Sequence, residues 1–179
     1  YMRTGVFETW KKRIPWLLLL MISAAFTGSI ITSFESALSA CVVLTAYIPM
    51  LMDTGGNAGG QASVTIIRGL SLDEIAFSDL LRVVWKEARV ALLCGLTLAA
   101  ANFVKLLVFD SVAVPVAAVV CLTLTSAVLI AKIVGCTLPM LAQKVGFDPA
   151  VMASPFITTI VDALSLLIYF RIATVLLHI

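Results

Sequence analysis

Three ionisable residues lie inside long apolar stretches of this sequence: Asp53, Lys132 and Asp162. A charge within an apolar segment costs several kcal/mol unless it faces protein, water or an ion. These residues are therefore the first candidates for chemistry. The two carboxylates are the more informative, because they can bind a cation.

Asp162 belongs to a stripe of polar side chains. Its members, spaced four, four, three and four residues apart, are Ser154, Thr158, Asp162, Ser165 and Tyr169. On an α-helix this spacing places them on one face. If the hydroxyls bond only their own backbone, Asp162 is a protonated packing residue. A carboxylate at the centre of the stripe instead favours a water-filled path.

Residues 53–61 form a glycine-rich segment, DTGGNAGGQ. Four glycines in six residues weaken a helix by about 1 kcal/mol each, so the sequence predicts an interruption. In a membrane such irregular backbone is buried in protein or lines a cavity. The alternative is close packing of a continuous helix, in which Asp53, Asn57 and Gln61 share a face.

The triplet Asp53-Thr54-Gly55 also matches the short active-site motif of aspartic proteases. That motif needs a loop in a β-rich fold, and its dyad would need Asp53 and Asp162 a few ångströms apart within one subunit. We therefore expect no enzyme.

The remaining polar or reactive residues suggest structural roles. Lys132 is expected to snorkel to the interface or to pair with an acid, and His178 is expected to be solvated. The four cysteines lie in apolar stretches without paired metal-ligand spacing, which is typical of inert packing residues; they are Cys41, Cys94, Cys121 and Cys136.

The elements that position these residues follow from composition. Hydrophobic residues make up 61% of the 179 and charged residues only 12%, whereas a soluble domain carries about a quarter charged residues. The sequence therefore predicts an integral membrane protein. Its net charge of +2 gives no argument for a nucleic-acid partner.

The predicted fold is an all-α membrane protein with five transmembrane helices, the second interrupted by the glycine-rich segment. Each spanning helix needs about 20 mostly apolar residues. The pair Asp148-Pro149 announces the last span, since Asp caps a helix and proline suits its first position. The expected spans are residues 14–34, 37–67, 83–109, 112–141 and 149–178, with a charged connection at 68–82.

The basic residues predict the orientation. They gather at the N-terminus and at the second and fourth connections: Arg3, Lys11, Lys12, Arg13, Arg68, Arg82, Lys86, Arg89 and Lys144. By the positive-inside rule the N-terminus is cytoplasmic and the C-terminus lies outside. Trp10, Trp16 and Trp85 fall near the predicted cytoplasmic helix ends, where indole is favoured. We expect a multi-pass protein of the cell (inner) membrane.

The polar residues suit a hard divalent cation. Mg²⁺ holds its octahedral water shell tightly, so a path for it should offer hard oxygen groups without stripping every water. One Asp162 per chain leaves a divalent ion half neutralised, whereas a two-fold axis would bring two together. Charge alone does not choose between Mg²⁺, Mn²⁺ and Ca²⁺.

Several segments resemble the MgtE family of Mg²⁺ channels. The run IPMLMDTGGNAGGQ at 48–61 resembles the family's second-helix motif. DPA at 148–150, TTIVD at 158–162 and LLIYF at 166–170 resemble its fifth helix, and WKE at 85–87 with GLT at 95–97 its third. The likeness covers essentially the whole chain.

The resemblance implies a homodimer whose pore follows the two-fold axis, lined by the second and fifth helices, with transported Mg²⁺ held at Asp162. It also implies an N-terminal cytoplasmic region with paired CBS modules that senses Mg²⁺, so we interpret residues 1–179 as a single isolated pore domain. The predicted metal-site residues are Asp162, Thr158, Ser154, Gly56, Asn57, Gly60 and Asp53.

A secondary transporter stays open as an alternative. Exchange of Mg²⁺ or another divalent cation for H⁺ or Na⁺ could use the same aspartates and a broken helix. Saturating flux that follows a proton or sodium gradient would indicate this class.

Overall fold

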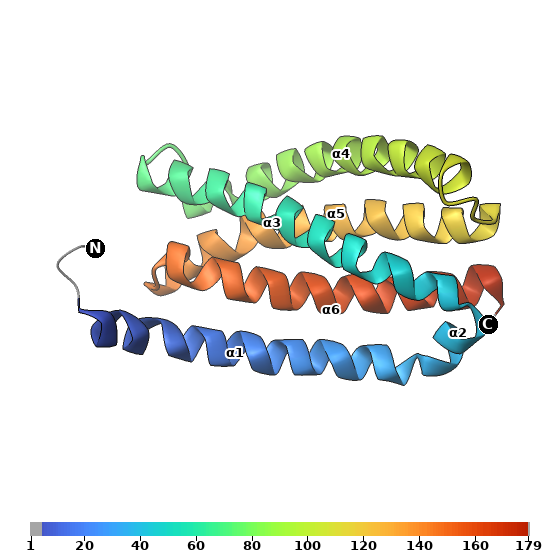
Figure 1. The fold of residues 1–179 in the computed structure, drawn as a ribbon. Coiled ribbons are helices and arrows are strands. Elements are labelled where there is room, and N and C mark those ends of the chain that lie inside the picture. Colours follow the sequence, from blue (N-terminus) through green and yellow to red (C-terminus); the bar gives the residue numbers. More distant parts are fainter. Residues whose placement is uncertain (1–4, 179) are drawn as a thin grey trace.

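The computed structural model describes residues 5–178, apart from the side chains of 12 and 150–155, and this part of the chain is almost wholly helical without strands (Figure 1). The long helices are α1 (Val6–Ser33), α3 (Ile48–Ser71), α4 (Leu80–Val108), α5 (Val114–Val145) and α6 (Pro149–Leu177). Shorter elements join them: α2 (Glu35–Ala40) and the 3₁₀ helices η1 (Val42–Tyr47) and η2 (Phe77–Asp79).

Within the described residues, four segments are long and apolar enough to cross a membrane: Val6–Ser33, Phe77–Val108, Val114–Val145 and Phe156–Leu177. They correspond to the predicted first, third, fourth and fifth spans. Helix α3, with 24 residues, is long enough to cross but too polar to be counted among them. Its glycines and its polar face lower its hydropathy.

Helix α5 is the centre of the bundle. It packs against α3, α4 and α6, and α6 also contacts α3 and α1. More than half of the apolar stretch of α5 is buried, 56%, against 11% for α1, which runs along the outside of the bundle beside α6 (Figure 1). An apolar helix with so little burial is suited to contact with lipid.

The predicted interruption of the second span at 53–61 is wrong. Helix α3 continues through all four glycines, and the irregular backbone lies earlier, at Cys41 and the 3₁₀ segment η1. Two glycines explain the continuity, because a Cβ on Gly59 would lie 2.7 Å from Cγ2 of Ile157, and one on Gly55 2.9 Å from Cγ1 of Val161. Close packing therefore offsets the low helix propensity of glycine, as the alternative expected.

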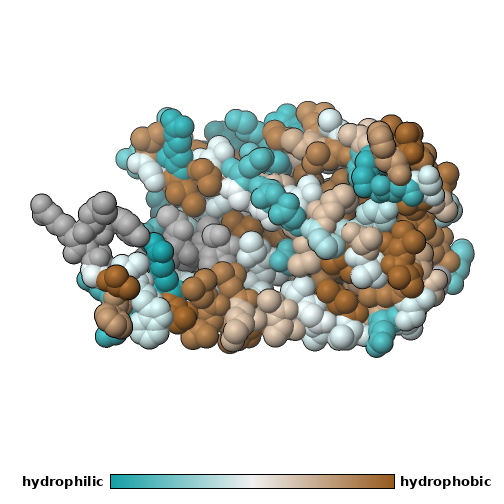
Figure 2. Space-filling view, viewed as in Figure 1, coloured by the Kyte–Doolittle hydropathy of each residue, from teal (hydrophilic) through white to brown (hydrophobic). Residues whose placement is uncertain are grey.

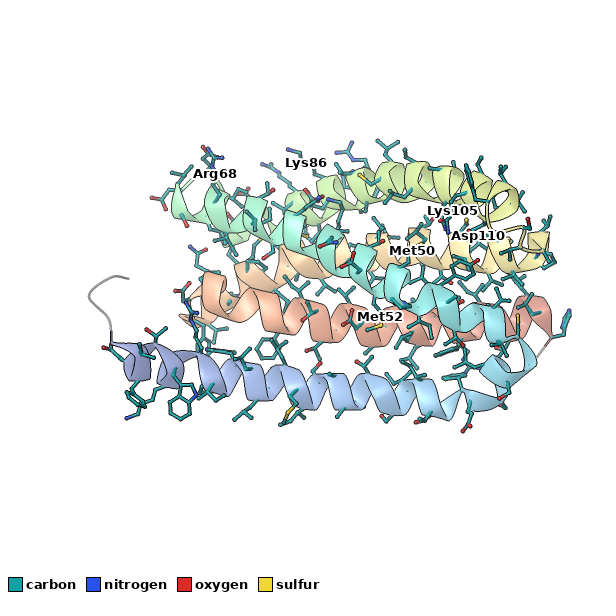
Figure 3. All side chains as sticks on the ribbon, in the orientation of Figure 1. Met50, Met52, Arg68, Lys86, Lys105 and Asp110 are labelled. Carbon is teal, nitrogen blue, oxygen red and sulfur yellow. The ribbon has the colours of Figure 1, made fainter. Side chains whose placement is uncertain are left out.

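Side-chain contacts fix the irregular segment to the bundle. The Tyr169 hydroxyl donates to the carbonyl of Leu44 at 2.8 Å, and the Tyr47 hydroxyl donates to Oδ2 of Asp110 at 3.2 Å. Lys105 pairs with the same carboxylate and thereby lowers the pKa of Asp110. The pair lies at the end of the bundle opposite Arg68 (Figure 3). These contacts hold the beginning of α3 in place.

Candidate functional site

A groove of about 990 Å³ runs between α3 and α6. Among the side chains of helix α6 that the structure describes, Thr158 and Asp162 line it. Helix α3 contributes the longer wall, made of Met52, Asp53, Gly56, Asn57, Gly60, Gln61, Val64 and Thr65. In Figure 2 a band of hydrophilic to intermediate colour crosses the apolar face along the course of α3.

The α3 wall carries an ordered carboxylate. Asp53, Asn57 and Gln61 are exposed and occupy successive turns of the continuous helix. Nδ2 of Asn57 donates to Oδ2 of Asp53 at 3.1 Å. This bond orients the carboxylate along the groove and leaves its other oxygen for water or a cation.

The two pairs of glycines in α3 face different surroundings. Gly55 and Gly59 pack against α5 and α6, whereas a Cβ built on Gly56 or Gly60 meets nothing within 4 Å. The open pair lines the groove. Intrachain packing therefore explains Gly55 and Gly59 but gives no reason for Gly56 and Gly60.

Asp162 lies on the opposite wall, partly buried near the middle of α6. It follows Pro149, where the helix begins, by 13 residues, or about 20 Å along the axis. Thr158 lines the groove one turn earlier. The groove thus brings together six of the seven predicted metal-site residues, and the side chain of the seventh, Ser154, lies outside those described.

The polar stripe of α6 is divided in the structure. Ser165 is only 1% exposed and lies beside Gly55, where a Cβ would come 3.6 Å from its Oγ. Tyr169 is fully buried and bonded to the 3₁₀ segment. The expectation that all stripe members share one water-filled path is therefore wrong, because the second half of the stripe faces the protein interior.

Lys132 pairs with an acid, as predicted. Its Nζ lies 3.6 Å from Oε2 of Glu87, and the two side chains are 8% and 14% exposed. Glu87 could not be selected as that partner from the sequence, because the pair is formed by the packing of α4 against α5. Lys132 also lines a second cavity of about 420 Å³ between α3, α4 and α5, which shares Asn57 and Gln61 with the groove.

The groove does not form a cage that would strip a metal of its water. Within residues 5–178 no group of three or more His, Cys, Asp or Glu side chains could hold an ion together. The protease reading also lacks its framework, because Asp53 belongs to a helix rather than a loop, and the described chain has no strand. Carboxylate, amide and hydroxyl groups spaced along an open groove instead suit a hydrated hard cation.

These features define the class: a multi-pass helical membrane protein with an oxygen-lined groove between two helices. The MgtE family profile, described as a divalent cation transporter, matches residues 48–172, which include all of α3 and most of α6. The chain belongs to the MgtE family.

Three relatives named magnesium transporter MgtE match nearly the whole chain. Identity is 38% to the Thermus thermophilus protein over 180 residues, covering 99% of this chain and 39% of that protein. For Bacillus subtilis it is 35% over 167 residues, covering 93% and 37%, and for Enterococcus faecalis 34% over 167 residues, also covering 93% and 37%. The chain thus spans about two fifths of the length of these relatives.

Proposed function

We propose that this chain forms the pore of a magnesium channel, which conducts hydrated Mg²⁺ passively between two identical subunits. The observation that carries the proposal is Asp162, a carboxylate near the middle of an apolar helix that opens into a 990 Å³ groove. The relatives' printed name, magnesium transporter, supports the choice of ion.

The volume of the groove suits an ion that keeps its water. Six waters at about 30 Å³ each occupy about 180 Å³, well below the 990 Å³ of the groove. An ion could therefore interact with Asp162, Thr158 and the α3 wall through its hydration shell. This matches the reluctance of Mg²⁺ to lose water.

The open side of the groove supports a homodimer. Asp53, Asn57 and Gln61 are exposed on a helix flanked by membrane-spanning segments, and such groups are costly against lipid. A second copy related by a two-fold axis would cover them and place two Asp162 carboxylates on one path. The space beside Gly56 and Gly60 would then become the pore.

The proposed topology has five spans, with α3 as the second. Lipid contact falls to the apolar outer helices, and α3 is sheltered by α5, α6 and the second subunit. In this proposal the N-terminus is cytoplasmic and the C-terminus lies outside, in the cell (inner) membrane, and the distribution of basic residues supports this orientation. A cytoplasmic regulatory region is expected in the full-length protein. The matched relatives are long enough to contain one, because this chain covers only about two fifths of their length.

Flux into liposomes tests the proposal. Purified protein is reconstituted with a Mg²⁺-sensitive dye inside the vesicles, and uptake is followed with H⁺ and Na⁺ gradients present, reversed or collapsed. A channel gives uptake that follows the Mg²⁺ gradient and the membrane potential alone. Uptake that requires a proton or sodium gradient would establish the exchanger instead.

A further inference from the structure

The outer face of α4 carries cations and apolar side chains in separate bands. Arg82, Lys86 and Arg89 are exposed and spaced four and three residues apart, which places them on one face. Farther along the helix, as far as Lys105, the exposed side chains are mostly apolar, with Leu93 68% and Leu96 54% exposed. Figure 3 shows Lys86 at the outer edge of α4, at the same end of the bundle as Arg68.

The length of the apolar band indicates where the three cations lie relative to the membrane. From Val90 to Val104, before Lys105, the helix covers about 22 Å at 1.5 Å per residue, which fits within the ~30 Å thickness of the hydrocarbon core with a cation at each end of the band. The three cations precede this band and occupy about 10 Å of helix. They therefore lie at the level of the lipid headgroups.

Trp85 and Arg89 form a preorganised pair within the cationic band. The indole is 65% exposed, and the Arg89 guanidinium lies 5.6 Å from its ring centroid. Nε of Arg89 also donates to the Trp85 carbonyl at 3.4 Å. Both contacts turn the guanidinium back toward the beginning of α4, away from the apolar band.

Neighbouring acids leave the face positive. The ion pair between Asp79 and Arg82 is long, 3.9 Å, and both side chains are in contact with solvent. Asp79 also accepts a hydrogen bond from the Ala76 amide. Glu87 points to the other side of α4, where it pairs with Lys132. The acids of the preceding turn, Asp73 and Glu74, are exposed outside the helix.

We propose that this face, consisting of Arg82, Trp85, Lys86 and Arg89, binds the phosphate headgroup of an anionic phospholipid. Two or three cations around one phosphate give charge complementarity, and Arg can bind phosphate oxygens with two parallel bonds. The exposed indole suits the interface, and the leucines beyond it suit an acyl chain. The proposal depends on membrane insertion and not on the ion that the groove conducts.

Fluorescence quenching by brominated lipid tests it. The 179-residue chain with Trp10→Phe and Trp16→Phe keeps Trp85 alone among the three tryptophans of the sequence. It is reconstituted into phosphatidylcholine vesicles containing equal mole fractions of either phosphatidylglycerol or phosphatidylcholine brominated near the headgroup. Each cation near an anionic surface contributes about 1 kcal/mol, or about fivefold, so we expect phosphatidylglycerol to be preferred at least fivefold.

Three variants distinguish binding at this face from general electrostatic attraction to the cytoplasmic end. The first replaces the cations of the face, as R82Q/K86Q/R89Q, and should lose the preference. A matched control removes one Lys and two Arg at the same end of the bundle, as K11Q/R13Q/R68Q, and should keep it. Arg82→Lys with Arg89→Lys retains the charge and should preserve most of the preference, while circular dichroism confirms that each variant is helical.

Three outcomes would overturn the proposal. Equal quenching by both lipids in the parent protein excludes selective binding. An equal loss in the control variant assigns the preference to the field of the whole cytoplasmic end. Protection of Trp85 from both lipids shows that another part of the protein covers the face.

Discussion

Replacing Asp162 by Asn should reduce Mg²⁺ flux more than tenfold. The substitution keeps the size and hydrogen-bonding capacity of the side chain but removes one charge per subunit. A carboxylate that contacts a hydrated Mg²⁺ through one water lies about 5 Å from the ion, the sum of a Mg–O bond and a hydrogen bond. The loss of attraction then depends on the dielectric environment of Asp162.

The structure brackets that environment. For charges of +2 and −1 at about 5 Å, the Coulomb energy is about 2 kcal/mol in water and about 7 kcal/mol at an effective dielectric constant of 20. Asp162 is partly buried but opens into the groove, so its contribution falls between these limits. The lower limit already exceeds the 1.4 kcal/mol that corresponds to a tenfold change in occupancy.

Growth rescue of a Mg²⁺-transport-deficient strain and dye-monitored uptake at equal expression would measure the effect. Asp162→Glu should be intermediate, because the charge remains while the longer side chain narrows the path. Ser165→Ala is the control, since Ser165 is buried away from the groove. Wild-type flux in Asp162→Asn would refute the reasoning and move the ion site to Asp53 and the α3 wall.

Three further results are expected. Thr158→Cys should form cross-links between subunits, and the same substitution at a lipid-facing position of α6 should not; the reverse pattern would exclude a pore on the dimer axis. Gly59→Ala should destabilise the protein by about 1–3 kcal/mol through overpacking, whereas Gly60→Ala should raise the melting temperature slightly, since its Cβ meets nothing within 4 Å and alanine has the higher helix propensity. Lys132→Met should cost about 3–5 kcal/mol by leaving Glu87 unpaired, and adding Glu87→Met should recover most of that stability; additive losses in thermal unfolding would show that the pair is not coupled.

The helices were predicted well from the sequence where high hydropathy alone defined them. Long apolar runs correctly indicated the four spans of α1, α4, α5 and α6, and Pro149 does begin α6. The failure at 53–61 has a clear cause. Helix propensity is local, whereas the contacts of Gly59 with Ile157 and of Gly55 with Val161 come from α6 and are not visible in the segment itself.

The division of the polar stripe could not be predicted for a related reason. A spacing of three and four residues places side chains on one face of a helix, but it does not say what that face contacts along its length. In α6, Thr158 and Asp162 meet the open groove, while Ser165 meets Gly55 and Tyr169 meets Leu44. The neighbouring helix determines which residues of that face line the groove and which are buried.

Helix α3 combines two features in one segment: close packing against its neighbours and open space along the groove. Gly55 and Gly59 let it approach α5 and α6 closely, which holds Asp162 across the groove from Asp53 and Asn57. One residue further along, Gly56 and Gly60 keep the opposite side free of side chains. A larger residue at the first pair would push the walls apart, and at the second pair it would fill the space between them. The paired glycines therefore set both the width and the openness of the groove, which is why a segment so poor in helix formers remains a continuous helix along its wall.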